Sequence, residues 1–369
     1  MSLNVIISGG GTGGHIFPAI AIALELNKIP NSKVLFIGAK NRMEMSHVPS
    51  AGFKIKGLWI SGFNRRNYLK NILLPLKIVY SLFKCFSVIN KNKPNVVVGT
   101  GGFASGPLVF SAALMGIPSI IQEQNALPGV TNRFLSKFAN VVCLGNKKAI
   151  NYFPKKKVIV TGNPLRYSSN NKSKTNAFKS VGLSPNKLTI LVIGGSLGSA
   201  RINQLIKYYL KDFMMLNVQL FWQCGKIYEQ KYKTLKNKNV HITPFIENMS
   251  SAYQISDIVI SRAGALAISE LSFYSKPTLF IPSPNVSENH QEKNAESLVN
   301  ENAALMVRED ESDEKFWPFI KKLIEDDFLR KKLSTNISKN SYPKATTEIV
   351  NLIKNCLLYT SDAADDIPR

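Results

Sequence analysis

Cysteine is scarce in this sequence and never closely paired. The 369 residues include 4 cysteines, at positions 85, 143, 224 and 356, and no CxxC motif. Cysteines this sparse do not form the disulfide framework of a small secreted domain. The chain also begins without the basic segment, apolar stretch and cleavage site of a secretory signal. We therefore expect a cytoplasmic protein.

Long apolar runs are absent as well. A membrane-spanning helix needs about 18 or more consecutive apolar residues, and the nearest candidate, residues 69–89, is interrupted by Lys70, Lys77 and Lys84. We expect a chain that does not span a membrane. With 44% hydrophobic and 19% charged residues it can bury a large core. Its length predicts two domains or one large one.

Acidic residues are nearly missing from the first half. Residues 1–163 contain 20 Lys and Arg but only three acids, Glu25, Glu44 and Glu123, and the whole chain has a formal net charge of +23. This excess predicts an extended anionic partner, either a nucleic acid or a membrane surface. Drift toward Lys and Asn in an A/T-biased coding sequence is the other explanation, but it accounts less easily for the complete lack of Asp.

The chain does contain a regular alternation of short β-branched runs and amphipathic stretches, which predicts βαβ units and parallel sheets. Strands are expected at 4–8, 34–37, 96–98, 119–121, 140–144 and 158–161, and then at 188–193, 218–222, 240–242, 257–261, 278–281 and 304–307. A linker rich in Ser, Asn and Lys separates the two sets, and residues 312–355 predict helices only.

These patterns predict two α/β domains, residues 1–163 and 164–355. The tail 356–369 lacks apolar periodicity and is expected to be disordered or non-native. Both domains open with a buried strand followed by glycines, at 5–11 and 191–196. This repeated pattern predicts two Rossmann-like units with parallel sheets facing a central cleft.

The first glycine-rich loop, residues 9–14, is typical of an anion site, because backbone N–H groups and a helix dipole point at the ligand. Its spacing fits G-x-G-x-x-G, but no acid ends the second strand, which disfavours NAD. Lys40 and Arg42 still allow NADP. A P-loop is disfavoured because His15 stands where Lys is required.

Three further glycine-containing loops follow expected strands, at 99–107, 194–199 and 262–270. The first two loops of the chain could hold a diphosphate between them, although a plain crossover connection explains 99–107 equally well. In the last loop, Gly264 permits close backbone approach and the following helix points its N–H groups at a phosphate. Glu270 can accept from both ribose hydroxyls through its two oxygens; otherwise it is a solvated helix residue.

Seven motifs now stand in order along residues 4–355, and together they resemble the MurG family of glycosyltransferase family 28. They are GGGTGGH at 9–15, GTGGFASGP at 99–107, QEQN at 122–125, GNPLR at 162–166, GGS at 194–196, the segment 262–270, and NHQ at 289–291 with Asn294-Ala295. The resemblance implies a GT-B fold. It also implies transfer of N-acetylglucosamine (GlcNAc) from UDP-GlcNAc to the MurNAc 4-hydroxyl of lipid I (undecaprenyl-diphospho-MurNAc-pentapeptide), with inversion, to give lipid II.

The resemblance also implies which residues contact the donor: Thr12, Gly13, Gly14, Asn125, Arg166, Ser196, Ile246, Ala265, Leu266, Ala267, Ile268, Ser269, Glu270 and Gln291. One departure is Leu197, where family members often carry Gln. The helix after Gly264 and Arg166 are the candidates to stabilise departing UDP. Since no Asp-x-Asp pair occurs, we expect no metal and no cofactor.

Attack by the acceptor hydroxyl needs a base, and the first half offers His15, His47, Glu25, Glu44 and Glu123. His15 is the first choice because it lies at a loop mouth. Glu123 is the second, because it ends a strand at the carboxyl edge where α/β sites form. A binding role for His15, to a phosphate or a loop carbonyl, is the alternative.

The stretch 67–93 carries Lys70, Lys77, Lys84 and Lys91 at seven-residue spacing among apolar residues, and follows Arg65-Arg66. It is typical of a helix lying on an anionic bilayer; an ordinary crossover helix with solvated lysines is the alternative. Expected partners are UDP-GlcNAc, lipid I, the anionic cytoplasmic membrane surface and other cell-wall synthesis proteins, but no nucleic acid. An NADP-dependent reductase is the second functional hypothesis, and a nucleic-acid-binding module the third.

Overall fold

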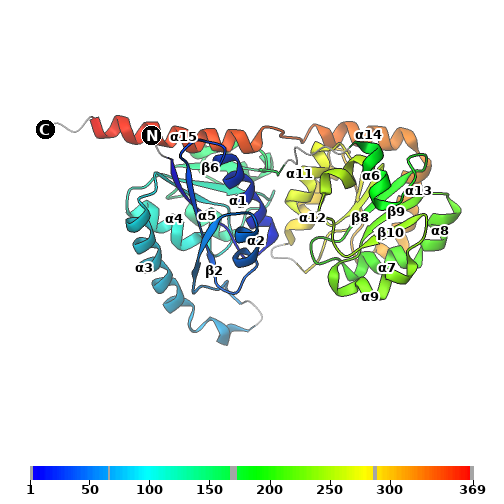
Figure 1. Ribbon diagram of the computed structural model, residues 1–369, viewed down its shortest axis with the longest axis horizontal. Coiled ribbons are helices and arrows are strands. Elements are labelled where there is room, and N and C mark those ends of the chain that lie inside the picture. The colour runs from blue at the N-terminus through cyan, green and yellow to red at the C-terminus, as the bar shows by residue number, and fades with distance from the viewer. Residues whose placement is uncertain (1–2, 65–66, 167–172, 286–288, 366–369) are drawn as a thin grey trace. The chain divides into compact units, whose positions relative to one another are not determined.

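The computed structural model describes residues 3–64, 67–166, 173–285 and 289–365, which form two compact α/β units (Figure 1). The first unit contains the chain up to Arg166 together with the segment from Tyr342 onward, and the second contains the residues between them. The α/β class and the two parallel sheets are confirmed. The predicted boundary at residue 163 lies within three residues of the observed one.

The first unit is built on a parallel sheet with the strand order β3-β2-β1-β4-β5-β6-β7. Its strands are β1 (Asn4–Ser8), β2 (Lys33–Ala39), β3 (Lys54–Leu58), β4 (Val96–Gly99), β5 (Ser119–Glu123), β6 (Val141–Leu144) and β7 (Val158–Val160). Val5 pairs with Val34 on one side and Val96 on the other. The strand order therefore reverses between β1 and β4, where α/β proteins commonly bind ligands.

Helices cover both faces of this sheet: α1 (Gly13–Leu26), α2 (Glu44–Ser50), α3 (Leu74–Asn92), α4 (Ser105–Leu114), α5 (Val130–Leu135) and α15 (Ala345–Asp365), with the short 3-10 turns η1 (Tyr68–Asn71), η2 (Lys147–Tyr152) and η3 (Lys155–Lys157). Val5 and Ile7 pack with α1, α2 and α15, whereas Ile6 packs with α3, α4 and α5. This alternation follows from the period of two along a strand.

The second unit repeats the plan with the strand order β10-β9-β8-β11-β12-β13. Its strands are β8 (Thr189–Ile193), β9 (Gln219–Gln223), β10 (Val240–Thr243), β11 (Ile258–Ser261), β12 (Thr278–Phe280) and β13 (Leu305–Met306). Its helices are α6 (Lys174–Val181), α7 (Ala200–Tyr208), α8 (Leu210–Met215), α9 (Glu229–Tyr232), α10 (Met249–Ile255), α11 (Ala265–Phe273), α12 (His290–Val299), α13 (Ser312–Glu325) and α14 (Asp327–Ser338). The order reverses between β8 and β11.

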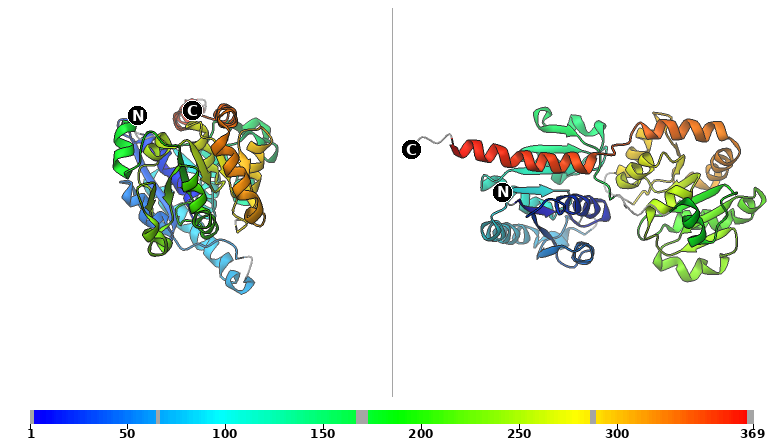
Figure 2. Two further views of the ribbon diagram at one scale, coloured as in Figure 1. Left: turned by 90° about the vertical axis from the view of Figure 1, so that its right-hand side faces the viewer. Right: turned by 45° about the horizontal axis from the view of Figure 1, so that its top comes forward.

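The last helix differs from the sequence prediction. Residues 345–355 were expected in the second domain and 356–369 in a disordered or non-native tail. Instead, α15 packs on α1 in the first unit and continues to Asp365, so the tail is helical up to that residue (Figure 2). Ile349, Ile353 and Cys356 recur at helical spacing and are buried in the core of the first unit. Residues 366–369 lie outside the described part of the chain.

The remaining differences are small. The strand β3 was missed, because two of its five residues are Lys, as is common for an edge strand. Within the expected linker, residues 174–181 form α6, and residues 167–172 lie outside the described ranges. Across the ranges described, no helix combines the length and apolarity needed to cross a bilayer.

Candidate functional site

The glycine loops after β1 and β4 lie against each other at the point where the first sheet reverses its order. The Gly10 N–H donates to the Gly101 carbonyl at 3.4 Å, and Thr100 Oγ1 donates to the His15 carbonyl at 2.7 Å. A Cβ on Gly102, whose φ is +77°, would lie 2.2 Å from the Gly10 oxygen. Only glycine permits this approach.

The His15 ring is fixed by its Nδ1 atom, which lies 3.1 Å from the Gly10 carbonyl oxygen and 3.1 Å from Thr12 Oγ1. Because a carbonyl oxygen can only accept, Nδ1 of the neutral ring carries the proton and Nε2 carries the lone pair. The ring is half-buried, whereas the neighbouring Thr12 and Gly14 are exposed. His15 therefore has the tautomer that a base acting through Nε2 requires.

Glu123 is held inside the unit, at 2% exposure. Its Oε1 accepts from the Asn125 backbone N–H at 3.0 Å and from Asn125 Nδ2 at 3.2 Å. Its Oε2 accepts from the Gly129 N–H at 3.2 Å and from Asn132 Nδ2 at 2.9 Å. Burial raises the pKa of Glu123, although these hydrogen bonds oppose that shift. Each carboxylate oxygen already accepts from two N–H groups. The carboxylate therefore fits a role in fixing the 124–129 loop better than a role as base.

Asn132 contacts this carboxylate and lies beside the same glycine as the histidine. A Cβ built on Gly101 would lie 2.9 Å from His15 Cδ2 and 3.2 Å from Asn132 Nδ2, so the two side chains flank the same glycine. Asn132 Nδ2 donates to Glu123 at 2.9 Å. The structure thus brings His15, Glu123 and Asn125 into one group at the carboxyl edge of the sheet.

Glu44 is the acid whose role the sequence did not indicate. It was one of several candidate bases, but the structure buries it completely beneath the first glycine loop. Its Oε2 accepts from the Gly11 N–H at 3.2 Å and its Oε1 from the Ala39 N–H at 2.9 Å. A Cβ on Gly10 would lie 2.3 Å from Oε1. Glu44 therefore supports the loop, and the Gly11 N–H is already occupied.

Buried side chains of two predicted motifs join neighbouring loops of the first unit. Gln122 donates to Asn163 Oδ1 at 2.8 Å, Asn163 donates to the Gln124 carbonyl at 3.2 Å, and Gln124 donates to the Thr100 carbonyl at 2.7 Å. All of these side chains are buried. They tie the loops after β4, β5 and β7 together, so the motifs at 122–125 and 162–166 hold the site edge in shape.

Arg166 lies in the first unit rather than with the predicted donor-binding half. Its guanidinium is 4.7 Å from the ring centroid of Phe17 on α1. The Phe17 ring in turn lies near Gly13, where a Cβ would be 3.0 Å from Phe17 Cε2. The positive charge of Arg166 is thus placed near the first turn of α1.

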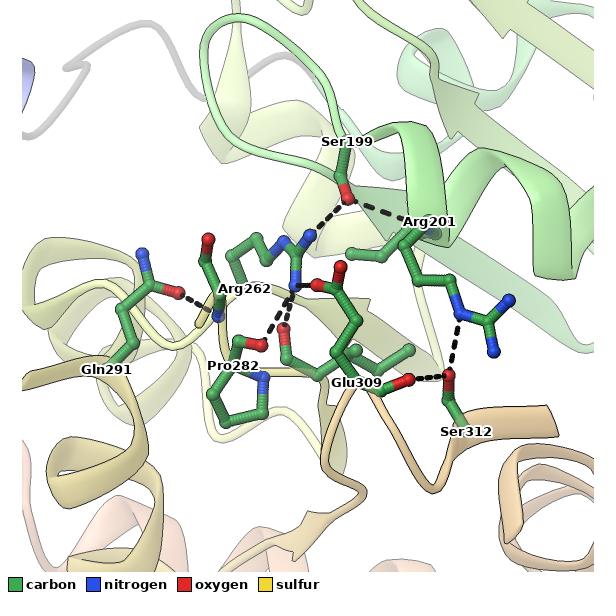
Figure 3. A network of polar contacts seen from close by, with 10 residues as sticks. Ser199, Arg201, Arg262, Pro282, Gln291, Glu309 and Ser312 are labelled. Atoms are coloured by element: carbon green, nitrogen blue, oxygen red, sulfur yellow. Dashed lines mark hydrogen bonds and ion pairs between the residues drawn. The ribbon is translucent and has the colours of Figure 1, made fainter. Parts of the chain in front are cut away.

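In the second unit, Arg262 joins three loops at the reversal between β8 and β11 (Figure 3). Its Nη1 donates to the Ile281 carbonyl at 3.0 Å, to the Pro282 carbonyl at 2.9 Å and to Glu309 Oε2 at 2.6 Å. Its Nη2 donates to Ser199 Oγ at 2.6 Å. The planar guanidinium therefore fixes the third glycine loop relative to the loop that precedes α11.

The N-terminus of α11 has the features of an anion site. Gly264, its N-cap, supplies no side chain to the first-turn N–H groups, and the first turn contains no acid. A Cβ on Gly264 would meet nothing within 4 Å among the described residues. Residues 265–270 are all half-buried. The positive end of the helix dipole therefore remains available to a phosphate.

The other predicted donor residues of the second unit are Glu270, Ile246, Gln291 and Ser196. Glu270 Oε2 accepts from the Tyr253 hydroxyl at 2.8 Å, and Ile246 belongs to the core cluster on which Ile268 packs. The Gln291 side chain contacts the loop after β12, where its Oε1 accepts from the Ser283 N–H at 2.9 Å (Figure 3). Ser196 is exposed beside Leu197, which is 75% exposed in the turn 195–198.

The surface of η1 and α3 is strongly apolar. The helix α3 buries only Ser81, Cys85, Val88 and Ile89. Large apolar side chains at least 39% exposed lie on this segment and just before it: Trp59, Phe63, Tyr68, Leu69, Ile72, Leu73, Leu76, Ile78, Val79, Tyr80 and Phe83. We call these residues the α3 apolar face. Lys77 donates to Ser61 Oγ at 3.1 Å beside it. Arg65, Arg66 and the side chain of Lys70 lie outside the described residues.

Comparison with known proteins gives consistent results for both units. Residues 5–144 match the glycosyltransferase family 28 N-terminal domain, and residues 189–352 match the family 28 C-terminal domain. A UDP-N-acetylglucosamine--N-acetylmuramyl-(pentapeptide) pyrophosphoryl-undecaprenol N-acetylglucosamine transferase of Christiangramia forsetii is 49% identical, covering 96% of this chain and 98% of the relative. The enzyme of the same description from Flavobacterium psychrophilum is 48% identical, covering 94% and 96%. The crystal structure of Acinetobacter baumannii MurG superposes with a TM-score of 0.76 at 28% identity, covering 96% and 99%.

Proposed function

This chain belongs to glycosyltransferase family 28, and from that premise we propose that it transfers GlcNAc from UDP-GlcNAc to the MurNAc 4-hydroxyl of lipid I, with inversion, to give lipid II. The observation that carries the proposal is nearly full-length similarity, at 48–49% identity, to two enzymes named for this transfer. The relatives named are transferases, so the reductase hypothesis gains no support.

The second unit binds the donor in this proposal. The first-turn N–H groups of α11 hold the diphosphate, and the Glu270 carboxylate accepts from the ribose hydroxyls. Ile246 and residues 265–269 line the nucleotide, while Ser196 and Gln291 contact the phosphate and sugar region. The absence of a capping side chain at Gly264 and the half-buried position of residues 265–270 support this assignment.

The first unit presents the acceptor. Nε2 of His15 takes the proton from the MurNAc 4-hydroxyl, whose oxygen attacks the anomeric carbon while the bond from that carbon to the UDP oxygen breaks. The tautomer set by the Gly10 carbonyl supports His15 in this role. Glu123 and Asn125 keep the neighbouring loop in place, and the exposed Thr12 and Gly14, with the half-buried Gly13 between them, complete the substrate contacts assigned to the first loop. Departing UDP is stabilised by the α11 dipole and by Arg166, without a metal ion.

In this proposal the enzyme binds the cytoplasmic face of the membrane through the α3 apolar face and meets lipid I there. Its exposed apolar side chains, with the basic excess of the first half, suit peripheral binding to an anionic bilayer. Interaction with other cell-wall synthesis proteins also belongs to this proposal.

A radiolabelled transfer assay with UDP-GlcNAc and a short-chain lipid I analogue tests the function. We expect a labelled disaccharide product whose rate is unchanged by EDTA. Lack of transfer with the intact protein would contradict the proposed reaction. Activity that EDTA abolishes and magnesium restores would contradict only the metal-free stabilisation of UDP.

A further inference from the structure

Tyr253, which lies on α10 outside every predicted motif, makes a hydrogen bond to the proposed ribose-binding carboxylate. Its hydroxyl is 2.8 Å from Glu270 Oε2 on the neighbouring helix α11. The tyrosine is 1% exposed, and its ring stacks on Tyr274 with centroids 5.0 Å apart. Burial raises the pKa of Tyr253 well above its ordinary value, so the hydroxyl keeps its proton and donates.

The hydrogen bond from Tyr253 restricts the orientation of the Glu270 side chain. A glutamate side chain on a half-buried helix surface has several rotamers, and holding one of them costs conformational entropy. A donor fixed in the core selects the rotamer in which Oε2 faces α10. The carboxylate is then oriented before any ligand arrives, which reduces the cost of binding.

We propose that Tyr253 is a positioning residue for nucleotide selection: it orients Glu270 so that the enzyme distinguishes a ribonucleoside diphosphate from its 2′-deoxy counterpart. This inference rests on the proposed function, in which Glu270 binds the ribose. A site built to hydrogen-bond a hydroxyl strongly rejects an analogue that lacks it, because the polar group of the protein is left unpaired. A freely rotating carboxylate relieves that penalty by turning toward water.

Calorimetric titration of the full-length protein with UDP and with 2′-deoxy-UDP tests the proposal. We expect the wild-type protein to bind UDP about 10- to 100-fold more tightly, as for one hydrogen bond to a charged group. Tyr253→Phe keeps the ring and removes only the hydroxyl, and should reduce this ratio roughly 3- to 10-fold. Tyr232→Phe is the matched control, since Tyr232 is also 1% exposed but packs in the other core cluster of this unit; its ratio should equal that of the wild type.

A double-mutant cycle with Glu270→Gln decides whether the tyrosine acts through the carboxylate. With Glu270 already replaced, Tyr253→Phe should produce no further loss of discrimination. Should Tyr253→Phe not fold, Glu270→Asp tests the same contact, because its shorter side chain withdraws the carboxylate from the tyrosine and should also reduce the ratio.

Failure of the inference differs from failure of the proposed function. If the wild type discriminates and Glu270→Gln does not, while folded Tyr253→Phe keeps the wild-type ratio, the tyrosine does not position Glu270 and the inference is overturned. An unchanged ratio in Glu270→Asp, or equal further losses from Tyr253→Phe in both backgrounds, would overturn it as well. Equal binding of UDP and 2′-deoxy-UDP by the wild type would instead remove Glu270 from the ribose site, and the inference with it.

Discussion

Three acids among the candidate residues of the two units are each held by specific hydrogen-bond donors. Glu44 is bound by two backbone N–H groups, Glu123 by four N–H donors, and Glu270 by a tyrosine hydroxyl. The sequence indicated Glu123 and Glu270 because they stand beside recognisable strands and glycines. It did not indicate the role of Glu44, because its loop partner Gly11 is 33 residues away and no periodicity connects the two.

Replacing Glu44 by Gln should destabilise the protein. The amide group has the same shape, and its oxygen can still accept from one of the two backbone N–H groups. Its NH₂ would face the other N–H, and these two opposed donors would both be unsatisfied, at a cost of about 1–3 kcal/mol. Glu25→Gln is the control, because Glu25 forms a surface pair with Lys28 that contributes roughly 0–0.5 kcal/mol. Urea unfolding measures both; equal free energies of unfolding for the two variants would show that Glu44 does not support the loop.

Replacing His15 by Ala should reduce kcat far more than it changes KM for UDP-GlcNAc. Loss of a general base typically lowers the rate by about 10²- to 10⁴-fold, while donor binding is assigned mainly to the second unit. Steady-state kinetics with the lipid I analogue provide the measurement. A variant whose defect lies only in KM would give His15 a binding role in place of a catalytic one.

Lys276 should make stability depend on pH. Burial lowers its pKa from 10.5 to about 8, and its Nζ donates to the Ser256 carbonyl at 2.7 Å. Between these values the unfolded chain binds a proton that the folded protein has lost, so this residue raises the free energy of unfolding as pH increases, by up to about 3 kcal/mol. Urea unfolding of the wild type and Lys276→Met at pH 8 and pH 10 isolates the effect; parallel pH dependences would disprove it.

At the scale of elements, regular alternation was sufficient to predict twelve of the strands, because buried parallel strands are short β-branched runs. The edge strand β3 was not predicted, because its two lysines interrupt such a run. The helix α15 was misassigned for a different reason. Its apolar spacing predicts a helix, but only packing on α1 determines which unit that helix joins.

The α3 apolar face should bind anionic vesicles. Leu69→Glu places a charge on this face, where the leucine is 76% exposed, and should weaken flotation with anionic liposomes. Leu197→Glu is a matched control, because Leu197 is 75% exposed on the third glycine loop of the other unit. Flotation at low and high salt measures the effect. Equal flotation of the two variants would contradict membrane binding by the α3 apolar face. Equal binding of the wild type to neutral and anionic vesicles would contradict only the electrostatic contribution to that binding.

At the scale of the whole molecule, the same α/β architecture occurs in both units. Each unit has a parallel sheet whose order reverses beside its opening strand, with glycine loops at that point. The echo of the two glycine openings in the sequence predicted this duplication. The sequence could not assign Arg166, which follows the last strand of the first unit and stacks on Phe17 there.

The proposed reaction requires the second unit to hold UDP at α11. A crystal structure of the protein with UDP-GlcNAc tests this most directly. We predict density for the diphosphate at the first turn of α11 and for the ribose hydroxyls within hydrogen-bonding distance of Glu270. Uridine bound at the first glycine loop, or anywhere away from Glu270, would contradict it.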